Sequence, residues 1–321
     1  MSAGADPSTD LRLVVVADDG GVDVPRNAGI VAAVRDGPVG VVSVLACGGA
    51  LADLVRRLGE LSASERPDVG LHFSLTHGTA CAGPLPGLTD ALGRFVLDKH
   101  ALWERAFEGR IDPDAVRREA LAQFGVLEAA GLRCVRVDGH QHVHLLPGVR
   151  EGLAAALALH PAVRWVRLGR PSCADGPERA AFPRLPAERV APAWRASLAA
   201  GRVAQAALGT LHDACDALRG GRLRSADVFA GADLVAACTE EAFLAEVHAA
   251  VRALRELPQA RGIIELMCHP GEPARGSVPF SASPHRAGER AALCGTALRD
   301  ALDALGVRVV RLRDVGEDAP R

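Results

Sequence analysis

Short apolar runs rich in β-branched residues alternate along this chain with longer Ala-, Leu- and Arg-rich stretches whose apolar positions recur at helical spacing. The short runs predict buried parallel strands, and the longer stretches predict the helices that connect them. The expected strands are Leu11–Ala17, Val39–Leu45, Val69–Leu75, Cys134–Val137, Val163–Leu168, Gly262–Met267 and Val307–Leu312. The expected helices include Arg26–Arg35, Ala50–Leu61, Pro113–Ala130, Val149–Leu159, Thr239–Leu257 and Ser283–Leu305.

This alternation amounts to about seven βα units without a repeat of fixed period. Polar residues stand at the carboxyl ends of several expected strands, which is where (β/α) barrels build their sites. We therefore predict an α/β fold, namely a distorted or incomplete TIM-like (β/α) barrel and not an open sheet. We expect residues 1–321 to form a single domain with its core at about residues 11–314.

Two stretches interrupt the alternation. Residues 76–110 are rich in Gly and Pro and predict a long ordered loop that carries a short hairpin or helix and borders the active site. Residues 171–230 combine Pro-punctuated loop with an Ala-rich segment over 191–218. This second stretch predicts an inserted segment or lid of mostly helical character.

Composition narrows the class of protein. The chain is 49% hydrophobic and 24% charged, which is enough apolar mass for a full core with the charge density of a globular protein. Its net charge of −2, with no block of like charge, argues against a nucleic-acid partner. No apolar run is long enough to span a membrane, and residues 1–10 lack the apolar region of a signal peptide. We therefore expect a cytoplasmic protein without membrane insertion.

The eight cysteines are dispersed and never form a C-x-x-C pair, so neither a zinc ribbon nor a disulfide framework is expected. We interpret them as small buried hydrophobes.

The first candidate for chemistry is the pair of carboxylates that ends the first expected strand, Asp18 and Asp19. Successive side chains on a strand point to opposite faces, so one carboxylate could ligate a metal while the other points elsewhere. Capping of the following helix is an equally open interpretation. His72 lies within the apolar third strand, where a lone histidine is more often a core residue than a ligand.

The strongest signal is the segment that follows the fourth expected strand. Asp138, His140, His142 and His144 occupy alternate positions there. Three imidazoles and a carboxylate so close together favour a metal site, because neutral histidine is a common metal ligand. Those that do not bind metal could orient the ligands through hydrogen bonds or contact the substrate.

A second histidine-terminated strand lies near the end of the chain, where Glu265 and His269 share one face. His269 is a candidate acid or base opposite the metal. Glu265 is either part of the site or a buried structural carboxylate paired with an arginine.

One Asp and two His on separate strands would leave room for water on the metal, which is the open arrangement of a catalytic site. A metal there would lower the pKa of that water and polarise a carbonyl. A nearby carboxylate would take the proton of the water and a histidine would return one to the leaving amine. This scheme suits amide hydrolysis.

Four segments in order resemble the YdjC/ChbG/HpnK family of carbohydrate deacetylases. They are ADDGG at 17–21, GLHFSLT at 70–76, VDGHQHVHLLPG at 137–148 and ELMCHPG at 265–271, with weaker echoes in PGLTDALGRF at 86–95 and DVFAG at 227–231. The resemblance implies a barrel-like fold and an N-acetylated sugar substrate, with a homodimer as a further expectation. It also implies one divalent ion, Mg²⁺ or Zn²⁺, held by Asp19, His72 and His140, with Asp18 as base and His269 as acid. Asp138, His142, His144 and Glu265 would then contact the substrate or support the ligands.

Gly20 departs from the family pattern, which usually has a phenylalanine after the Asp pair. This departure predicts a changed pocket wall or turn beside the metal.

The main hypothesis is removal of an N-acetyl group from an amino sugar, an oligosaccharide or a glycoconjugate. One alternative keeps the metal site but hydrolyses another amide or an ester in secondary metabolism. Another is a non-catalytic sugar-binding protein on the same fold, against which the retention of Asp18 and all three ligands argues.

Overall fold

The sheet is parallel throughout its described strands, as the alternating pattern predicts. In a computed structural model of the protein, the described residues are 10–168, 170–171, 223–235, 238–257, 262–272 and 279–315. The strands follow the spatial order β5-β4-β3-β2-β1-β8-β7-β6, with β9 also paired to β1. They are β1 (Leu11–Gly20), β2 (Val39–Val44), β3 (Asp68–Phe73), β4 (Cys134–Gly139), β5 (Trp165–Val166), β6 (Arg170–Pro171), β7 (Val228–Ala230), β8 (Ile263–Cys268) and β9 (Val307–Val309).

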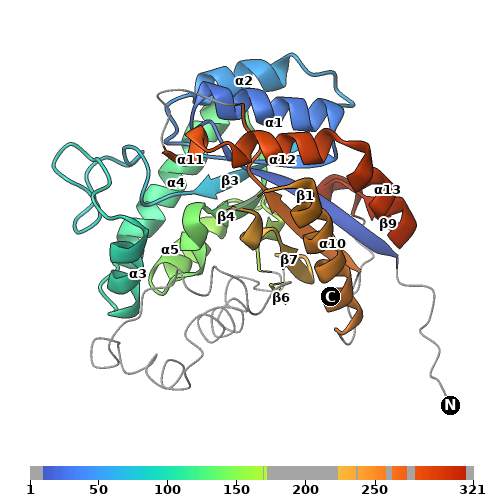
Figure 1. The fold of residues 1–321 in the computed structure, drawn as a ribbon. Coiled ribbons are helices and arrows are strands. Elements are labelled where there is room, and N and C mark those ends of the chain that lie inside the picture. Colours follow the sequence, from blue (N-terminus) through green and yellow to red (C-terminus); the bar gives the residue numbers. More distant parts are fainter. Residues whose placement is uncertain are drawn as a thin grey trace.

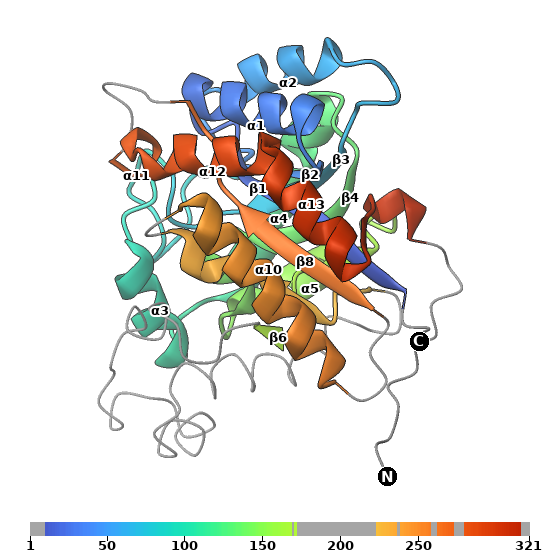
Figure 2. The same ribbon diagram turned by 45° about the vertical axis from the view of Figure 1, so that its right-hand side comes forward.

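Helices surround the sheet on its outer side (Figures 1 and 2). Helices α10, α12 and α13 lie on the β8 side in Figure 2, and α1 and α2 follow β1 and β2. Of the described helices, none is both long and apolar enough to cross a membrane. They are α1 (Val24–Asp36), α2 (Leu51–Gly59), α3 (Lys99–Phe107), α4 (Pro113–Ala129), α5 (Val149–Leu157), α10 (Glu240–Arg255), α11 (Pro279–Ala282), α12 (His285–Cys294) and α13 (Thr296–Leu305), with 3₁₀ turns η1 (His140–Leu145), η3 (Ala232–Val235) and η4 (Leu312–Asp314).

The sheet curls until its two ends approach each other. Arg224, which leads into β7, accepts a backbone hydrogen bond from Val166 of β5 (2.8 Å) and donates one to Arg164 (2.7 Å). Trp165 of β5 and Arg224 form an isolated parallel bridge, which brings β5 next to the segment that leads into β7. The prediction of a single-domain, incomplete TIM-like barrel is confirmed.

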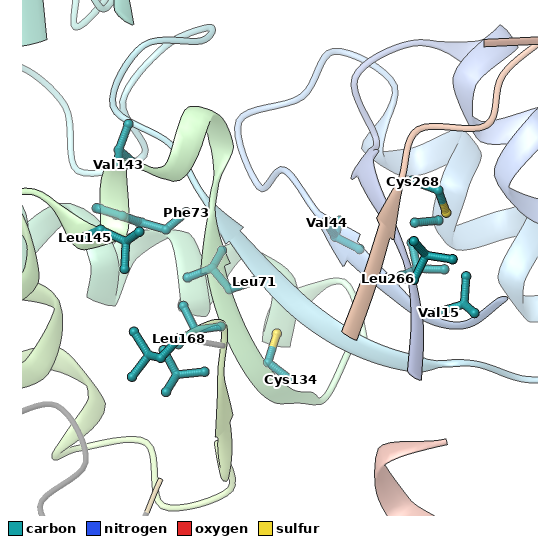
Figure 3. Close-up of a cluster of buried hydrophobic side chains, with 14 of the residues drawn as sticks. Val15, Val44, Leu71, Phe73, Cys134, Val143, Leu145, Leu168, Leu266 and Cys268 are labelled. Atoms are coloured by element: carbon teal, nitrogen blue, oxygen red, sulfur yellow. The ribbon is translucent and has the colours of Figure 1, made fainter. Parts of the chain in front are cut away.

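Alternation along the strands separates two apolar clusters. Outward-facing residues such as Val15, Val44, Leu71 and Phe73 pack with the helices in the main core (Figure 3). Inward-facing residues form a smaller cluster at the amino ends of the strands, which comprises Val14, Val16, Val41, Trp165, Ala226, Ile263, Leu312 and Val315. Beyond this small cluster, toward the carboxyl ends, the inward positions become polar, and this is where the candidate site lies.

Several elements differ from the sequence-based expectation. The helix expected over Ser283–Leu305 is divided at Gly295, whose backbone is extended, so that α12 and α13 are separate. The strand expected over Val163–Leu168 pairs as a strand only over Trp165–Val166. The short strands β6 and β7 were not predicted, and most of the segment 171–230 lies outside the described residues. Residues 76–110 do carry a hairpin-like pair of bridges and the helix α3.

Glu119 of α4 fixes the loop that follows β3. Its buried carboxylate accepts hydrogen bonds from the backbone N–H groups of Cys81 and Ala82 (both 2.9 Å) and from Gln123 Nε2 (2.7 Å). We expect Glu119→Ala to lower the free energy of unfolding by about 1–3 kcal/mol, because two part-buried backbone N–H groups lose the hydrogen bonds to its carboxylate. Urea denaturation measures this loss, and the exposed Glu128→Ala on the same helix is the control. Equal stability of the two variants would contradict the proposed clamp.

Candidate metal centre

The three predicted ligands are brought together at the carboxyl end of the sheet. The Oδ1 atom of Asp19 lies 2.9 Å from His140 Nδ1 and 3.3 Å from His72 Nε2, and one ligand atom from each residue falls within 4.8 Å of the others. Burial alone would raise the pKa of Asp19, but the neighbouring His140 and His72 hold that pKa well below its usual range. The carboxylate is therefore ionised and available to a cation.

A backbone turn at the end of β1 separates the two adjacent carboxylates. Asp19 has φ of 63°, in the left-handed region that non-glycine residues rarely adopt. Asn27 of α1 stabilises the turn, since its Oδ1 accepts from the backbone N–H of Gly21 at 2.8 Å. This local geometry lets Asp19 face both histidines, while Asp18 is bonded to Arg167 at the edge of the cluster. Such strained positions are concentrated at functional sites.

His72 is oriented by the neighbouring strands. Its Nδ1 lies 2.7 Å from Asp138 Oδ1, across the β3–β4 register, and Ser43 of β2 donates to the same oxygen at 2.5 Å. A proton on Nδ1 donated to Asp138 leaves Nε2 directed at Asp19, which is the usual arrangement of a metal-binding histidine. Burial by itself lowers the pKa of His72, but the carboxylates of Asp18 and Asp138 outweigh it and raise that pKa to about 10. The same negative field favours a divalent cation at this point.

His140 lies on the open side of the cluster. Its side chain is 18% exposed, whereas those of His72 and Asp19 are 2% and 3% exposed. Gln141 and His142 follow with φ of 56° and 58°, so the chain turns sharply after the ligand, and Thr76 Oγ1 donates to Gln141 Oε1 at 3.0 Å. Of the three candidate ligands, His140 is therefore the one that solvent reaches.

A layer of ion pairs fills the barrel interior beneath the cluster. Arg167 donates to both carboxylate oxygens of Asp18 (2.6 and 2.8 Å) and to Glu265 Oε1 (2.5 Å), and lies 3.0 Å from Asp138 Oδ2. Arg136 pairs with Glu265 at 2.8 Å and with Asp138 at 3.0 Å. All five side chains are 8% exposed or less. Of the two open interpretations of Glu265, the structure places it in the buried ion pair.

The remaining histidines of the motif lie outside the ligand cluster. His144 Nε2 donates to the backbone oxygen of Arg167 at 2.9 Å, and burial lowers its pKa to about 4, so its ring is neutral and fixes the Arg167 segment. His142 packs edge-on against Phe229, with ring centroids 5.6 Å apart, and burial lowers its pKa well below the usual value.

His269 lies within electrostatic reach of Asp19 and of two arginines, Arg26 and Arg286. Arg26 Nη1 donates to the backbone oxygen of His269 at 3.2 Å and lies 3.7 Å from Asp19 Oδ2, while Glu289 accepts from the backbone N–H of His269. Burial lowers the pKa of His269 well below its usual value, and although Asp19 opposes this shift, Arg286 and Arg26 add to it. The ring is therefore neutral at neutral pH.

Arginine and serine partners of the site were missed in the sequence. Arg136 and Arg167 each interrupt an apolar run. Buried guanidinium groups require carboxylate partners, so the several carboxylates expected in the interior could have indicated that these two arginines are buried. Gly70 makes room for one of them, because a Cβ there would lie 2.4 Å from Arg136 Cγ. Ser43 offered no comparable signal.

Gly20 does not face the candidate site. A Cβ at this position would meet Val42 Cγ1 at 2.9 Å and Leu54 Cδ2 at 3.0 Å, in the layer between the sheet and α2. Of the two effects predicted for Gly20, the changed pocket wall is wrong, because the turn at Asp19 directs this position into the apolar core, and the changed turn stays a prediction. The effect of the glycine falls on sheet–helix packing.

Comparison with known families identifies relatives along nearly the whole chain. The family model described as YdjC-like protein matches residues 12–304. A human protein named carbohydrate deacetylase is 33% identical over 97% of this chain and 93% of its own length. A protein of Enterobacter sp. (strain 638) named chitooligosaccharide deacetylase is 35% identical over 44% of this chain and 53% of its own length.

A solved structure supports the architecture. A protein of Enterococcus faecalis V583 named for cellobiose-phosphate cleavage superposes with a TM-score of 0.65 at 17% identity, covering 96% of this chain and 99% of that one. At this identity the likeness concerns the fold alone.

Proposed function

The chain belongs to the YdjC-like protein family, and from this premise we propose that it is a metal-dependent hydrolase that removes the N-acetyl group from an amino sugar, an N-acetylated oligosaccharide or a glycoconjugate. The relatives named carbohydrate deacetylase and chitooligosaccharide deacetylase support hydrolysis of an acetamide on a sugar. The observation that carries the proposal is the cluster of Asp19, His72 and His140, which lies next to an ion-paired carboxylate, Asp18.

The donor set fits one divalent ion. One carboxylate and two imidazoles supply oxygen and nitrogen ligands, and His72 is already oriented by Asp138. Two nitrogen donors favour Zn²⁺ over Mg²⁺, which prefers oxygen. A bound ion would polarise the acetyl carbonyl and lower the pKa of an attacking water.

Asp18 is the proposed base. Its Oδ2 lies 4.0 Å from His72 Nε2, so the carboxylate borders the ligand cluster, and the two hydrogen bonds from Arg167 hold it in one orientation. It accepts the proton that the water loses as the C–O bond forms. Burial raises the pKa of Asp18, and the guanidinium of Arg167, whose own pKa is raised well above its usual value, opposes that shift.

His269 is the proposed acid for the leaving amine. Because its pKa lies well below the usual value, the ring is neutral before the reaction and carries one N–H proton. It would act as acid after it receives the proton that Asp18 takes from water, and it would pass a proton on to the amide nitrogen in the same turnover. The C–N bond breaks as the nitrogen is protonated, which gives the free amino sugar and acetate.

Removal of divalent metal tests this proposal directly. We expect dialysis against a chelator to lower acetate release from N,N′-diacetylchitobiose by more than about tenfold, and stoichiometric Zn²⁺ to restore it. Acetate release and metal content are measured on the same samples. Full activity without metal would contradict the proposal. Hydrolysis of 4-nitrophenyl acetate without action on any N-acetylated sugar would favour the ester alternative.

The homodimer and the cytoplasmic location stay predictions from the sequence, and so does the lid formed by residues 171–230.

A further inference from the structure

His77, to which the mechanism gives no role, lies on the open side of the cluster. Its ring centroid is 5.9 Å from that of His140, and the ring planes meet at 73°. The residue is partly exposed. Within the described part of the chain, no hydrogen bond or ion pair involves its side chain, and only its backbone N–H is bonded. The imidazole is therefore held next to a candidate ligand with both ring nitrogens free for another molecule.

The backbone around His77 is fixed on both sides. The Oγ atom of Ser74 accepts from the N–H of His77 at 3.2 Å, and the preceding Thr76 is bonded to Gln141. Gly78 follows with φ of 74°, and a Cβ there would lie only 2.6 Å from the backbone oxygen of Cys47. Only glycine fits such a position without strain. These contacts fix the backbone that carries His77, and the ring lies edge-on to that of His140.

A substrate bound at the cluster would extend toward the side on which His77 lies. Asp19 and His72 are almost completely buried, and Arg167 and Arg136 fill the barrel interior beneath them. An acetamide that reaches the cluster must therefore leave the rest of its molecule on the side of His140. A neutral imidazole offers one donor and one acceptor, which suits a sugar hydroxyl. Specific sites use a few such placed polar groups.

We propose that His77 is a specificity-determining residue that binds a hydroxyl group of the sugar carrying the acetamide, an inference that rests on the proposed deacetylase function. His77 would distinguish an N-acetylated sugar from an acetyl compound without hydroxyl groups. It would not bind the metal, since it lies outside the candidate ligand groups found among the described residues.

The test compares His77→Ala, His77→Phe and His77→Asn with wild type on two substrates. N,N′-diacetylchitobiose offers hydroxyl groups, and 4-nitrophenyl acetate offers none. We expect the Ala and Phe variants to raise the KM for the sugar about tenfold with little change in kcat, because one hydrogen bond of uniform binding is lost. The ratio of kcat/KM for sugar to that for ester should fall by the same factor. The Asn variant, which keeps a donor and an acceptor, should recover most of this ratio.

Metal content and a distant control separate this role from a structural one. His248→Ala on the exposed side of α10 should leave both substrates and the metal unchanged. Equal losses on both substrates, or loss of metal, in His77→Ala would overturn the inference by showing that the ring supports His140. An unchanged substrate ratio would overturn it as well. If the wild type releases no acetate from any sugar, the proposed deacetylase function is refuted. If the wild type is active and the His77 variants keep its substrate ratio, only the inference about His77 is refuted.

Discussion

The variant His140→Ala should lose stoichiometric divalent metal and at least about 10³-fold of its acetate release while keeping its fold. Metal activation of water and carbonyl supplies several kcal/mol of transition-state stabilisation, and each 1.36 kcal/mol corresponds to a factor of ten in rate. His140 is the most exposed of the three candidate ligands, so its truncation leaves no large cavity. Its partner Asp19 still faces His72 and Arg26.

Three measurements check this expectation. Elemental analysis gives the metal content, circular dichroism gives the melting temperature, and an acetate assay gives the rate. His248→Ala is the matched control, because it removes an imidazole from an exposed helix position far from the cluster in sequence. A His140→Ala protein with full metal occupancy and wild-type rate would exclude His140 as a ligand.

The placement of the cluster could be predicted from sequence because it depends on parallel-strand geometry. Carboxyl ends of parallel strands meet at one edge of the sheet, so Asp19 and His140, both expected at strand ends, could be placed near each other. The expected parallel strands and the positions of the polar residues relative to them were enough for this prediction. His72 was expected within its strand, and its place in the ligand set came from the family resemblance.

The ion pairs beneath the cluster could not be predicted in the same way. Arg167 contacts Asp18 across 149 positions and Glu265 across 98. It also follows β5, a strand of two residues that periodicity detects poorly. Which carboxylate pairs with which guanidinium depends on the curl of the sheet and on a missing side chain at Gly70. Neither the curl of the sheet nor the space left at Gly70 can be recognised from a local sequence pattern.

Two errors have local physical causes. The helical pattern continues through Gly295, so one helix was expected where the extended backbone of that glycine divides two. The direction of Gly20 depends on the left-handed φ of Asp19, which strand alternation does not include. Strand alternation predicted that the side chains of Asp18 and Asp19 would point in different directions. The direction of the next residue, Gly20, is set instead by the backbone turn at Asp19.

Asp18→Asn should keep the metal and lose about 10²- to 10⁴-fold in kcat, the range that general base catalysis contributes. The amide has the shape of the carboxylate but cannot take a proton from water. The fold should persist, because Asp138 and Glu265 still face Arg167 and Arg136 after one negative charge is removed.

Glu265→Gln is the matched control, since it also removes one carboxylate from Arg167 but borders no candidate ligand. We expect its kcat to fall much less than that of Asp18→Asn. Equal losses in the two variants would mean that Asp18 acts through the charge balance of Arg167 and not through proton transfer. Loss of metal from Asp18→Asn would instead make Asp18 a ligand, because Asp18, His72 and Asp138 also have ligand atoms within 4.8 Å of one another. The metal content of this one variant therefore decides which of the two carboxylates at the end of β1 binds the ion and which one acts on the water.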